Sequence, residues 1–299
     1  MRIIVYGNLH NKNKEGINLL KPKGVKVLYF DNLDNIKLYD DGNTILICND
    51  AIEPINFSKI IYGPGIDFKD VVRYCKNNKD KNINIDMLSE WNKNLIKKIC
   101  PESKANFMSL PFPVNVDKFK PDNKENKAFI YFNSVEIYRL QFAINLIKKL
   151  NINCKIFSYE KKYDEQDYLN YIKSSRFGIW VGRHESQGFA FQEALSCDCP
   201  LFVLDINSMK DECCNRHYYP WRNTEISYDK LKATAASYWS DECGLLCENL
   251  KYNNLDYNRL ENDFKIFLSK INSYNPRKFI LENLTTKQFI NHLKNYFNI

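Results

Sequence analysis

Two glutamates eight positions apart frame a glycine turn in the stretch Glu185-Ser186-Gln187-Gly188-Phe189-Ala190-Phe191-Gln192-Glu193. The stretch follows an apolar run at 177–181, typical of a buried parallel strand, and leads into a helical pattern that ends near Pro200. Open α/β sheets bind ligands at the carboxyl ends of their strands. A helix that begins there offers unpaired N–H groups and the positive end of its dipole to phosphate. The pattern therefore predicts a site for a phosphate-bearing ligand with hydroxyl groups, such as a nucleotide sugar.

The residue types of this stretch fit such a ligand. Glu185, at the end of the strand, is expected to hold sugar hydroxyls, and Glu193, two helical turns on, is expected to reach the ribose of a nucleotide. Gly188 lets the backbone approach the ligand where a side chain would block it. Each glutamate alone is explained as a capping or exposed helical acid, but their combination with the glycine turn favours a ligand site. The donor-binding residues expected in the turn are Ser186, Gln187, Gly188, Phe189 and Ala190.

The elements that position these residues alternate between apolar runs and helical patterns, which is typical of parallel α/β layers. The strands expected in the first part of the chain are Ile3–Tyr6, Val25–Phe30, Thr44–Cys48, Lys59–Tyr62, Ile83–Met87 and Asn106–Leu110. The clearest helices there are Phe68–Lys76 and Glu90–Ile99, the second with Ser89 at its N-cap.

Three prolines and a polar continuation mark an extended connector from Leu110 to Lys127. It is the strongest candidate for a domain boundary. The strands expected beyond it are Ala128–Asn133, Cys154–Phe157, Phe177–Val181 and Leu201–Leu204. The helices expected there are Ile137–Leu150, Asp164–Ser174, Gln187–Ser196, Asp229–Tyr238 and a helical tail at 254–299 that breaks near Pro276.

The predicted organisation is therefore an amino-terminal Rossmann-like domain at 1–113, a linker at 114–127 and a carboxyl-terminal Rossmann-like domain at 128–275. Terminal helices at 276–299 are expected to pack back on the first domain. The fold class is α/β, with two doubly wound domains that face an interdomain cleft.

Composition indicates an ordinary globular protein, because 44% of the 299 residues are hydrophobic and 26% are charged. The net charge of +7 is scattered, which argues against nucleic acid as a partner and leaves weak contact with a membrane surface open. No apolar run approaches the roughly 20 residues of a transmembrane helix. The stretch 1–7 reads as a first strand rather than a signal peptide, so we expect a cytoplasmic protein with reduced cysteines. Their spacing does not support a metal site.

Five segments in order resemble the motifs of retaining GT-B glycosyltransferases, the group 1 or family 4-like enzymes that use nucleotide sugars. The first is the E-x7-E pattern itself. The others are Ser89-Glu90-Trp91, the connector 110–121, Glu193-Ala194-Leu195-Ser196-Cys197-Asp198-Cys199-Pro200 and Cys243-Gly244-Leu245-Leu246. Together they span about 89–246, and the first 88 residues match only as a generic strand–loop–helix beginning.

The resemblance implies GT-B architecture and transfer of a sugar from a nucleotide-diphosphate sugar to an acceptor hydroxyl. It implies retention of configuration without a dedicated protein base, and no metal or other cofactor. The donor site is expected in the carboxyl-terminal domain. The acceptor, a glycan, glycolipid or glycoprotein, is expected on the amino-terminal side.

The chain departs from the family pattern after the first strand of the second domain. Arg139 falls where the family has a phosphate-binding lysine, and it is expected to stabilise the leaving diphosphate. Ser134 replaces the family's arginine and offers only a hydroxyl. Arg183 could replace the missing arginine as a cation for the diphosphate, and an ordinary surface position explains it equally well. In the amino-terminal domain, Gly7 is expected to bind the donor. His10 beside it is the only histidine available for the family's catalytic histidine, although an exposed loop histidine explains it as well.

Two alternatives remain open at this stage. One is another GT-B-like enzyme, such as a nucleotide-sugar epimerase or an inverting transferase. The other is a catalytically idle GT-B-fold binding or scaffold protein, which the serine at 134 keeps in consideration. A dehydrogenase of the Rossmann type fits poorly, because no G-x-G-x-x-G follows the first strand.

Overall fold

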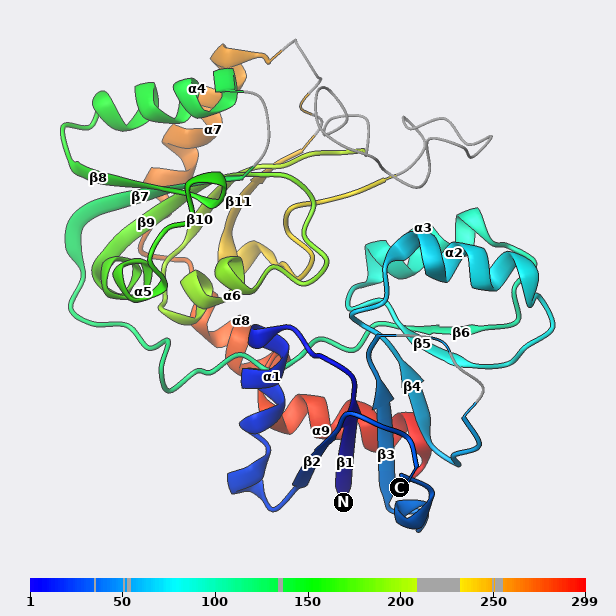
Figure 1. Ribbon diagram of the computed structural model, residues 1–299. Helices are drawn as coiled ribbons and strands as arrows, with labels where there is room; N and C mark the ends of the chain where they lie inside the picture. Colours follow the sequence, from blue (N-terminus) through cyan, green and yellow to red (C-terminus); the bar gives the residue numbers. More distant parts are fainter. Residues whose placement is uncertain are drawn as a thin grey trace. The chain divides into compact units, whose positions relative to one another are not determined.

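The computed structural model describes residues 1–34, 36–50, 52, 55–133, 137–208, 232–248, 250 and 255–299. The described residues form two compact units. The first unit contains Met1–Asn115 and Leu284–Ile299, and the second unit contains the described residues of 116–283. Figure 1 shows a sheet with flanking helices in each unit.

The first unit is built on a parallel sheet of six strands in the order β2-β1-β3-β4-β5-β6. Its strands are β1 (Arg2–Tyr6), β2 (Lys26–Phe30), β3 (Thr44–Cys48), β4 (Ile60–Tyr62), β5 (Asn84–Asp86) and β6 (Asn106–Met108). All six were expected at these places from apolar runs. Buried parallel strands read as continuous hydrophobic segments because both faces are covered, and every residue of β3 is buried.

Four helices accompany this sheet: α1 (Asn11–Asn18), α2 (Phe68–Asn77), α3 (Glu90–Ile99) and α9 (Thr286–Phe297). The sequence predicted α2 and α3, and Ser89 occupies the N-cap position of α3 as expected. Helix α9, from the end of the chain, packs in this unit, where the rings of Phe289 and Phe112 lie 5.6 Å apart. The hydroxyl of Tyr296 also donates to Asn84 Oδ1 at 2.6 Å.

The second unit has a parallel five-stranded sheet in the order β11-β10-β9-β7-β8. Its strands are β7 (Glu125–Asn133), β8 (Asn153–Ser158), β9 (Ser175–Gly182), β10 (Leu201–Leu204) and β11 (Gly244–Cys247). Strand β7 begins at Glu125, inside the segment that was expected to be an extended connector. Strand β11 was not expected as a strand, although its Gly-Leu-Leu run had been singled out as a motif.

The helices of the second unit are α4 (Ile137–Lys148), α5 (Glu165–Ser174), α6 (Phe189–Ser196), α7 (Tyr257–Ser269) and α8 (Pro276–Asn283). Helices α4 and α7 cover one face of the sheet, and α5 and α6 lie on the other (Figure 1). Successive side chains of strand β7 point to opposite faces of the sheet, so the strand packs against both helix layers. Its Ile130 joins the core under α4 and α7, while the ring of Tyr131 lies 6.1 Å from that of Tyr168 on α5.

Three expectations about the helices need correction or completion. Of the expected helix at 229–238, residues 229–231 lie outside the described residues, and 232–238 form an irregular segment. Helix α6 begins at Phe189 rather than at Gln187. The helical tail breaks at Pro276 as expected, and a second break separates α8 from α9. Within the described part of the chain, no helix combines the length and apolar character that crossing a membrane requires.

Candidate functional site

The strand order of the second sheet reverses between β7 and β9, which makes the carboxyl ends of these strands a topological switch point, the usual ligand position in such sheets. Asn133 ends β7, and its Nδ2 donates to Glu185 Oε1 at 3.1 Å. The N–H of Arg183 donates to the carbonyl of Asn133 at 3.1 Å. Strand β9 and its following loop are thus tied to β7, and the Glu185 side chain is held at the switch point.

Helix α6 begins at Phe189, four residues beyond Glu185, and its N-cap is a glycine. Gly188 has φ 80° and ψ 58°, a left-handed conformation that glycine adopts without steric cost. Because glycine has no side chain, the N-cap residue itself makes no capping hydrogen bond to the first turn of this helix. The N–H groups of a first helical turn and the positive end of the helix dipole are the groups that bind anions in proteins.

The side chain of Gln187 is hydrogen-bonded within the turn before α6. Its Nε2 donates to Gln192 Oε1 at 3.1 Å, and Gln192 Nε2 donates to the carbonyl of Gln187 at 2.8 Å. Both side chains are buried. This pair of hydrogen bonds fixes the turn before α6.

Glu193 lies on α6 and is only 4% exposed. Its helix is held to α5 by Tyr168, whose hydroxyl donates to the carbonyl of Ala190 at 2.8 Å. The pKa of Tyr168 is raised by its burial first and then by the nearby Tyr163 and Glu193. The two glutamates of the motif therefore differ, because Glu185 is half-buried at the sheet edge and Glu193 lies within the packed helix layer.

Asp205 is a buried acid at the carboxyl end of β10 that sequence reasoning missed. Its Oδ1 accepts from the N–H of Ala235 at 2.7 Å, and its Oδ2 accepts from the hydroxyl of Thr234 at 2.8 Å. Burial raises the pKa of Asp205 to about 7, against the opposing effect of these hydrogen bonds. The available signal was its place directly after the apolar run 201–204, where an acid meets the binding edge of the sheet.

Arg139 joins this group from α4. Its side chain is fully buried, and its Nη1 donates to the backbone carbonyl of Asp205 at 3.4 Å. A second link ties the same segment to the motif, because the carbonyl of Thr234 accepts from the N–H of Glu185 at 3.1 Å. Asn133, Glu185, Asp205 and Arg139 therefore belong to one connected polar network at the carboxyl edge of the second sheet.

The remaining predicted residues of the second unit lie around the motif or outside the described residues. Ser186, Phe189, Ala190 and Arg183 are half-buried around the start of α6. Ser134 lies outside the described residues. Among the residues that the structure describes, no cluster of three or more histidine, cysteine or acidic side chains is arranged to hold a metal ion.

Gly7 and His10 lie in the first unit, after β1. Gly7 has φ 87°, and a Cβ at this position would come within 2.5 Å of Asp50 Oδ2. The glycine is thus required by the approach of Asp50. His10 is exposed and forms the N-cap of α1, where its Nδ1 accepts from the N–H of Lys12 at 3.4 Å.

Comparisons with known proteins give a structural match and no sequence match. No family model and no curated protein matches the chain. A mutant of S. aureus TarM, solved in complex with Fondaparinux, alpha-GlcNAc-glycerol and UDP, matches 87% of this chain and 56% of its own, with a TM-score of 0.51 and 15% identity. Accessory secretory protein 1, 2 and 3 of Streptococcus pneumoniae matches 85% of this chain and 54% of its own, with a TM-score of 0.38 and 12% identity.

The chain therefore spans about half the length of these solved structures. The match to TarM confirms the expected fold class, an α/β chain of GT-B architecture. The second match is too distant to add to this assignment.

Proposed function

We propose that the chain is a glycosyltransferase that moves a sugar from a nucleotide-diphosphate sugar to an acceptor hydroxyl. The observation that carries the proposal is the N-cap of α6, the left-handed Gly188, which has no side chain to cap the helix and lies three positions from Glu185 at the switch point. A diphosphate fits the helix N-terminus. A sugar bonded to it would extend toward a carboxylate that can accept hydrogen bonds from its hydroxyls.

The roles follow from these positions. Backbone N–H groups of Phe189 and Ala190 bind the diphosphate, and Glu185, oriented by Asn133, holds the sugar. Glu193 binds the ribose hydroxyls from within the helix layer, which requires movement of neighbouring groups because it is only 4% exposed. Arg139 and Arg183 supply positive charge toward the leaving diphosphate. The likeness to a solved structure that contains UDP supports this type of donor.

Donor binding is the first test. The full chain is screened by thermal shift against UDP, GDP, ADP and their hexose derivatives, because a ligand that binds the folded state raises the melting temperature by mass action. Glu193→Gln is expected to weaken the best donor by about tenfold or more, since a hydrogen bond to a charged group contributes about 1.5–3 kcal/mol. The matched control is Glu165→Gln, an exposed glutamate in the first turn of α5. A flat response to every nucleotide, or equal affinity in wild type and Glu193→Gln, contradicts the donor site.

Transfer is the second test. With the best donor and a panel of acceptors, Asn133→Ala is expected to lower kcat about tenfold with donor affinity little changed, because Asn133 orients Glu185 rather than binding the nucleotide. NMR of the product determines its anomeric configuration, and the proposal expects retention and undiminished activity in EDTA. Donor binding without hydrolysis or transfer would favour a binding or scaffold protein. Inversion, or epimerised donor, would favour the other GT-B-like activities.

A further inference from the structure

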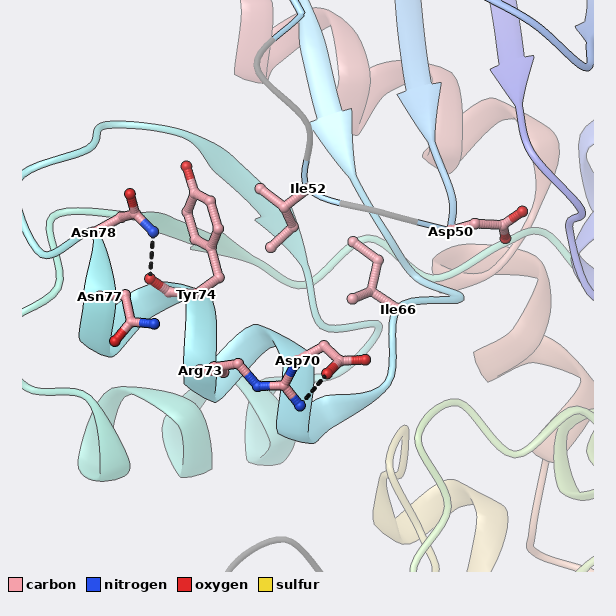
Figure 2. Close-up of a pocket in the computed structure, with 8 residues that line it drawn as sticks. All are labelled: Asp50, Ile52, Ile66, Asp70, Arg73, Tyr74, Asn77 and Asn78. Atoms are coloured by element: carbon pink, nitrogen blue, oxygen red, sulfur yellow. Dashed lines mark hydrogen bonds and ion pairs between the residues drawn. The ribbon is translucent and has the colours of Figure 1, made fainter.

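The first unit contains a cavity of about 380 Å³ beside α2 (Figure 2). It opens at the carboxyl ends of the neighbouring strands β3 and β4, where ligands of parallel sheets bind. Its volume is near the lower end of the roughly 300–1,000 Å³ of small-molecule sites, which suits one or two sugar-sized rings. The residues that line it are Asp50, Ile52, Ile66, Asp70, Arg73, Tyr74, Asn77 and Asn78.

One wall of this cavity is fixed by buried Asn49. Its Oδ1 accepts from the N–H of Gly65 at 2.9 Å, and its Nδ2 donates to the carbonyl of Asn8 at 2.8 Å and to Asp50 Oδ1 at 2.7 Å. A Cβ at position 65 would overlap the Asn49 amide, so the two residues pack as closely as glycine allows. The loop that carries Ile66 is thereby tied to the end of β3, and this side of the cavity is formed before any ligand arrives.

The lining has an apolar and a polar side. Ile66 and the ring of Tyr74 supply apolar surface, and burial raises the pKa of the Tyr74 hydroxyl, which keeps it protonated as a donor. Asn77 is exposed at the end of α2, and Asn78 Nδ2 donates to the carbonyl of Tyr74 at 3.1 Å. Figure 2 shows both amides beside the tyrosine, on the same stretch of helix. Amides offer both donors and acceptors at one site.

The charges of the cavity disfavour an anion. The lining contains two carboxylates, Asp50 and Asp70, and the cation Arg73, whose Nη2 lies 3.0 Å from Asp70 Oδ1. The N-terminus of α2 adds no anion site, because Asp67 caps it by accepting from the N–H of Lys69 at 2.9 Å. A phosphate here would meet more negative than positive charge.

We propose that this cavity is a binding site for a neutral saccharide of one or two rings. The apolar C–H face of a sugar packs on the Tyr74 ring, and its hydroxyls exchange hydrogen bonds with the Asn77 and Asn78 amides and the Asp70–Arg73 pair. A sugar combines an apolar face with a rim of hydroxyls, and the lining has a matching apolar side and polar side. The inference goes beyond the proposed function, since a saccharide can bind here whether or not the second unit transfers sugar.

The test measures saccharide binding to the full chain by saturation-transfer NMR and calorimetry. The ligands are methyl α- and β-glycosides of glucose, galactose and N-acetylglucosamine, together with maltose and cellobiose, and inorganic phosphate and uridine serve as comparison ligands. At least one saccharide is expected to bind, and phosphate is not expected to bind in this cavity. Tyr74→Ala is expected to weaken the saccharide by about tenfold or more, as truncation of a central aromatic contact does.

Three further variants separate binding from folding. Tyr74→Phe keeps the ring and is expected to retain most of the affinity, while Asn77→Ala, at an exposed helix end that tolerates truncation, is expected to lose several-fold. Lys76→Ala, exposed on the same helix outside the cavity, is the matched control. Saccharide affinity that is the same in wild type, Tyr74→Ala and Asn77→Ala overturns the proposal, as does uridine binding that displaces every saccharide.

The donor site and this cavity fail independently. Glu193→Gln is expected to lose nucleotide binding and keep saccharide binding, and Tyr74→Ala is expected to do the reverse. A wild-type chain that binds saccharide but no nucleotide would thus contradict only the proposed function. A wild-type chain that binds nucleotide but no saccharide would overturn only the cavity proposal.

Discussion

The two sheets share a strand order around an equivalent switch point, between β1 and β3 in the first unit and between β7 and β9 in the second. In the first unit the polar groups at this point bind one another, because Asp50 Oδ2 accepts from the N–H of Asn8 at 2.6 Å and Asn49 bridges the same loops. In the second unit the corresponding contact is the Asn133–Glu185 pair, beside a helix that begins at once. Equivalent topology therefore serves loop fixation in one unit and a candidate ligand site in the other.

Helices α1 and α2 of the first unit differ from α6 of the second unit at their N-termini. In the first unit α1 is capped by the His10 side chain and α2 by the Asp67 side chain. In the second unit α6 has Gly188 at its N-cap and, within the described ranges, no capping side chain. An acid at an N-cap uses the N–H groups that an anion would need. The comparison favours a phosphate-bearing ligand for the second unit and a neutral one for the first.

Each unit also buries one acid at the carboxyl edge of its sheet. Asp86, at the end of β5, has one oxygen that accepts from the N–H groups of Leu88 at 2.8 Å and Leu110 at 3.0 Å. Burial raises the pKa of Asp86 to about 7, as it does for Asp205 in the second unit. Asp86 holds backbone together, whereas Asp205 belongs to the network around Glu185.

The largest expected effect is the pH dependence of stability that Asp86 contributes. Its pKa rises from 3.8 unfolded to about 7 folded, so between these values the native state keeps a proton that the unfolded chain has lost. Stability from this group is therefore present below about pH 4 and lost as the pH rises through 7. At about 1.36 kcal/mol per pKa unit, the loss is about 4 kcal/mol. Asp86→Asn is expected to gain stability relative to wild type by up to that amount between pH 4 and 8, measured by urea unfolding.

Asp205→Asn provides the matched comparison in the second unit. It is expected to change the pH dependence in the same direction and also to alter donor binding, whereas Asp86→Asn leaves donor binding unchanged. A pH profile for Asp86→Asn parallel to wild type would show that Asp86 does not hold a proton in the folded state. Altered donor binding in Asp86→Asn would remove the functional difference between the two acids.

The second prediction exchanges the capping pattern between the units. Gly188→Asp puts an acid at the N-cap of α6, as Asp67 is at α2, and it is expected to weaken the best nucleoside diphosphate about tenfold more than Gly188→Asn does. Both variants bear the strain of a left-handed backbone, which asparagine and aspartate tolerate better than most residues. The difference between them therefore reports charge at the helix N-terminus. Calorimetry on both variants measures it, and equal losses would mean that no phosphate binds there.

The strands were predictable because their physical cause is local. Residues such as 44–48 and 201–204 are buried on both faces, so the sequence shows continuous apolar runs. The place of Glu185 just beyond a strand was predictable for the same reason, since it lies four residues after the apolar run at 177–181. These inferences required only the neighbours of each residue in the sequence.

The elements that were missed depend on distant partners. Residues 232–238 contain Ala233, Ala235 and Ala236 and have high helix propensity, yet Asp205 binds the backbone of Ala235 and holds the segment irregular. Helix α1 was missed because Asn, Lys and Glu dominate it and leave only Ile17 as an apolar buried residue. The network around Asp205 joins residues about 30 positions apart, and no local spacing reveals such a pair.

The smallest expected effect concerns His10 and decides whether the first unit contributes a side chain to the reaction. As an N-cap through a 3.4 Å hydrogen bond, His10 is expected to contribute at most about 1 kcal/mol to stability. His10→Asn retains a capping side chain and removes the imidazole, while His10→Ala removes both. If His10 only caps α1, then Asn restores both stability and kcat, and Ala lowers stability slightly with kcat unchanged. If the imidazole acts on the sugar, kcat falls equally in both variants although Asn restores stability. Unfolding curves and kcat for the two variants therefore separate the helix cap from the catalyst at the position where the first unit was expected to supply a catalytic side chain.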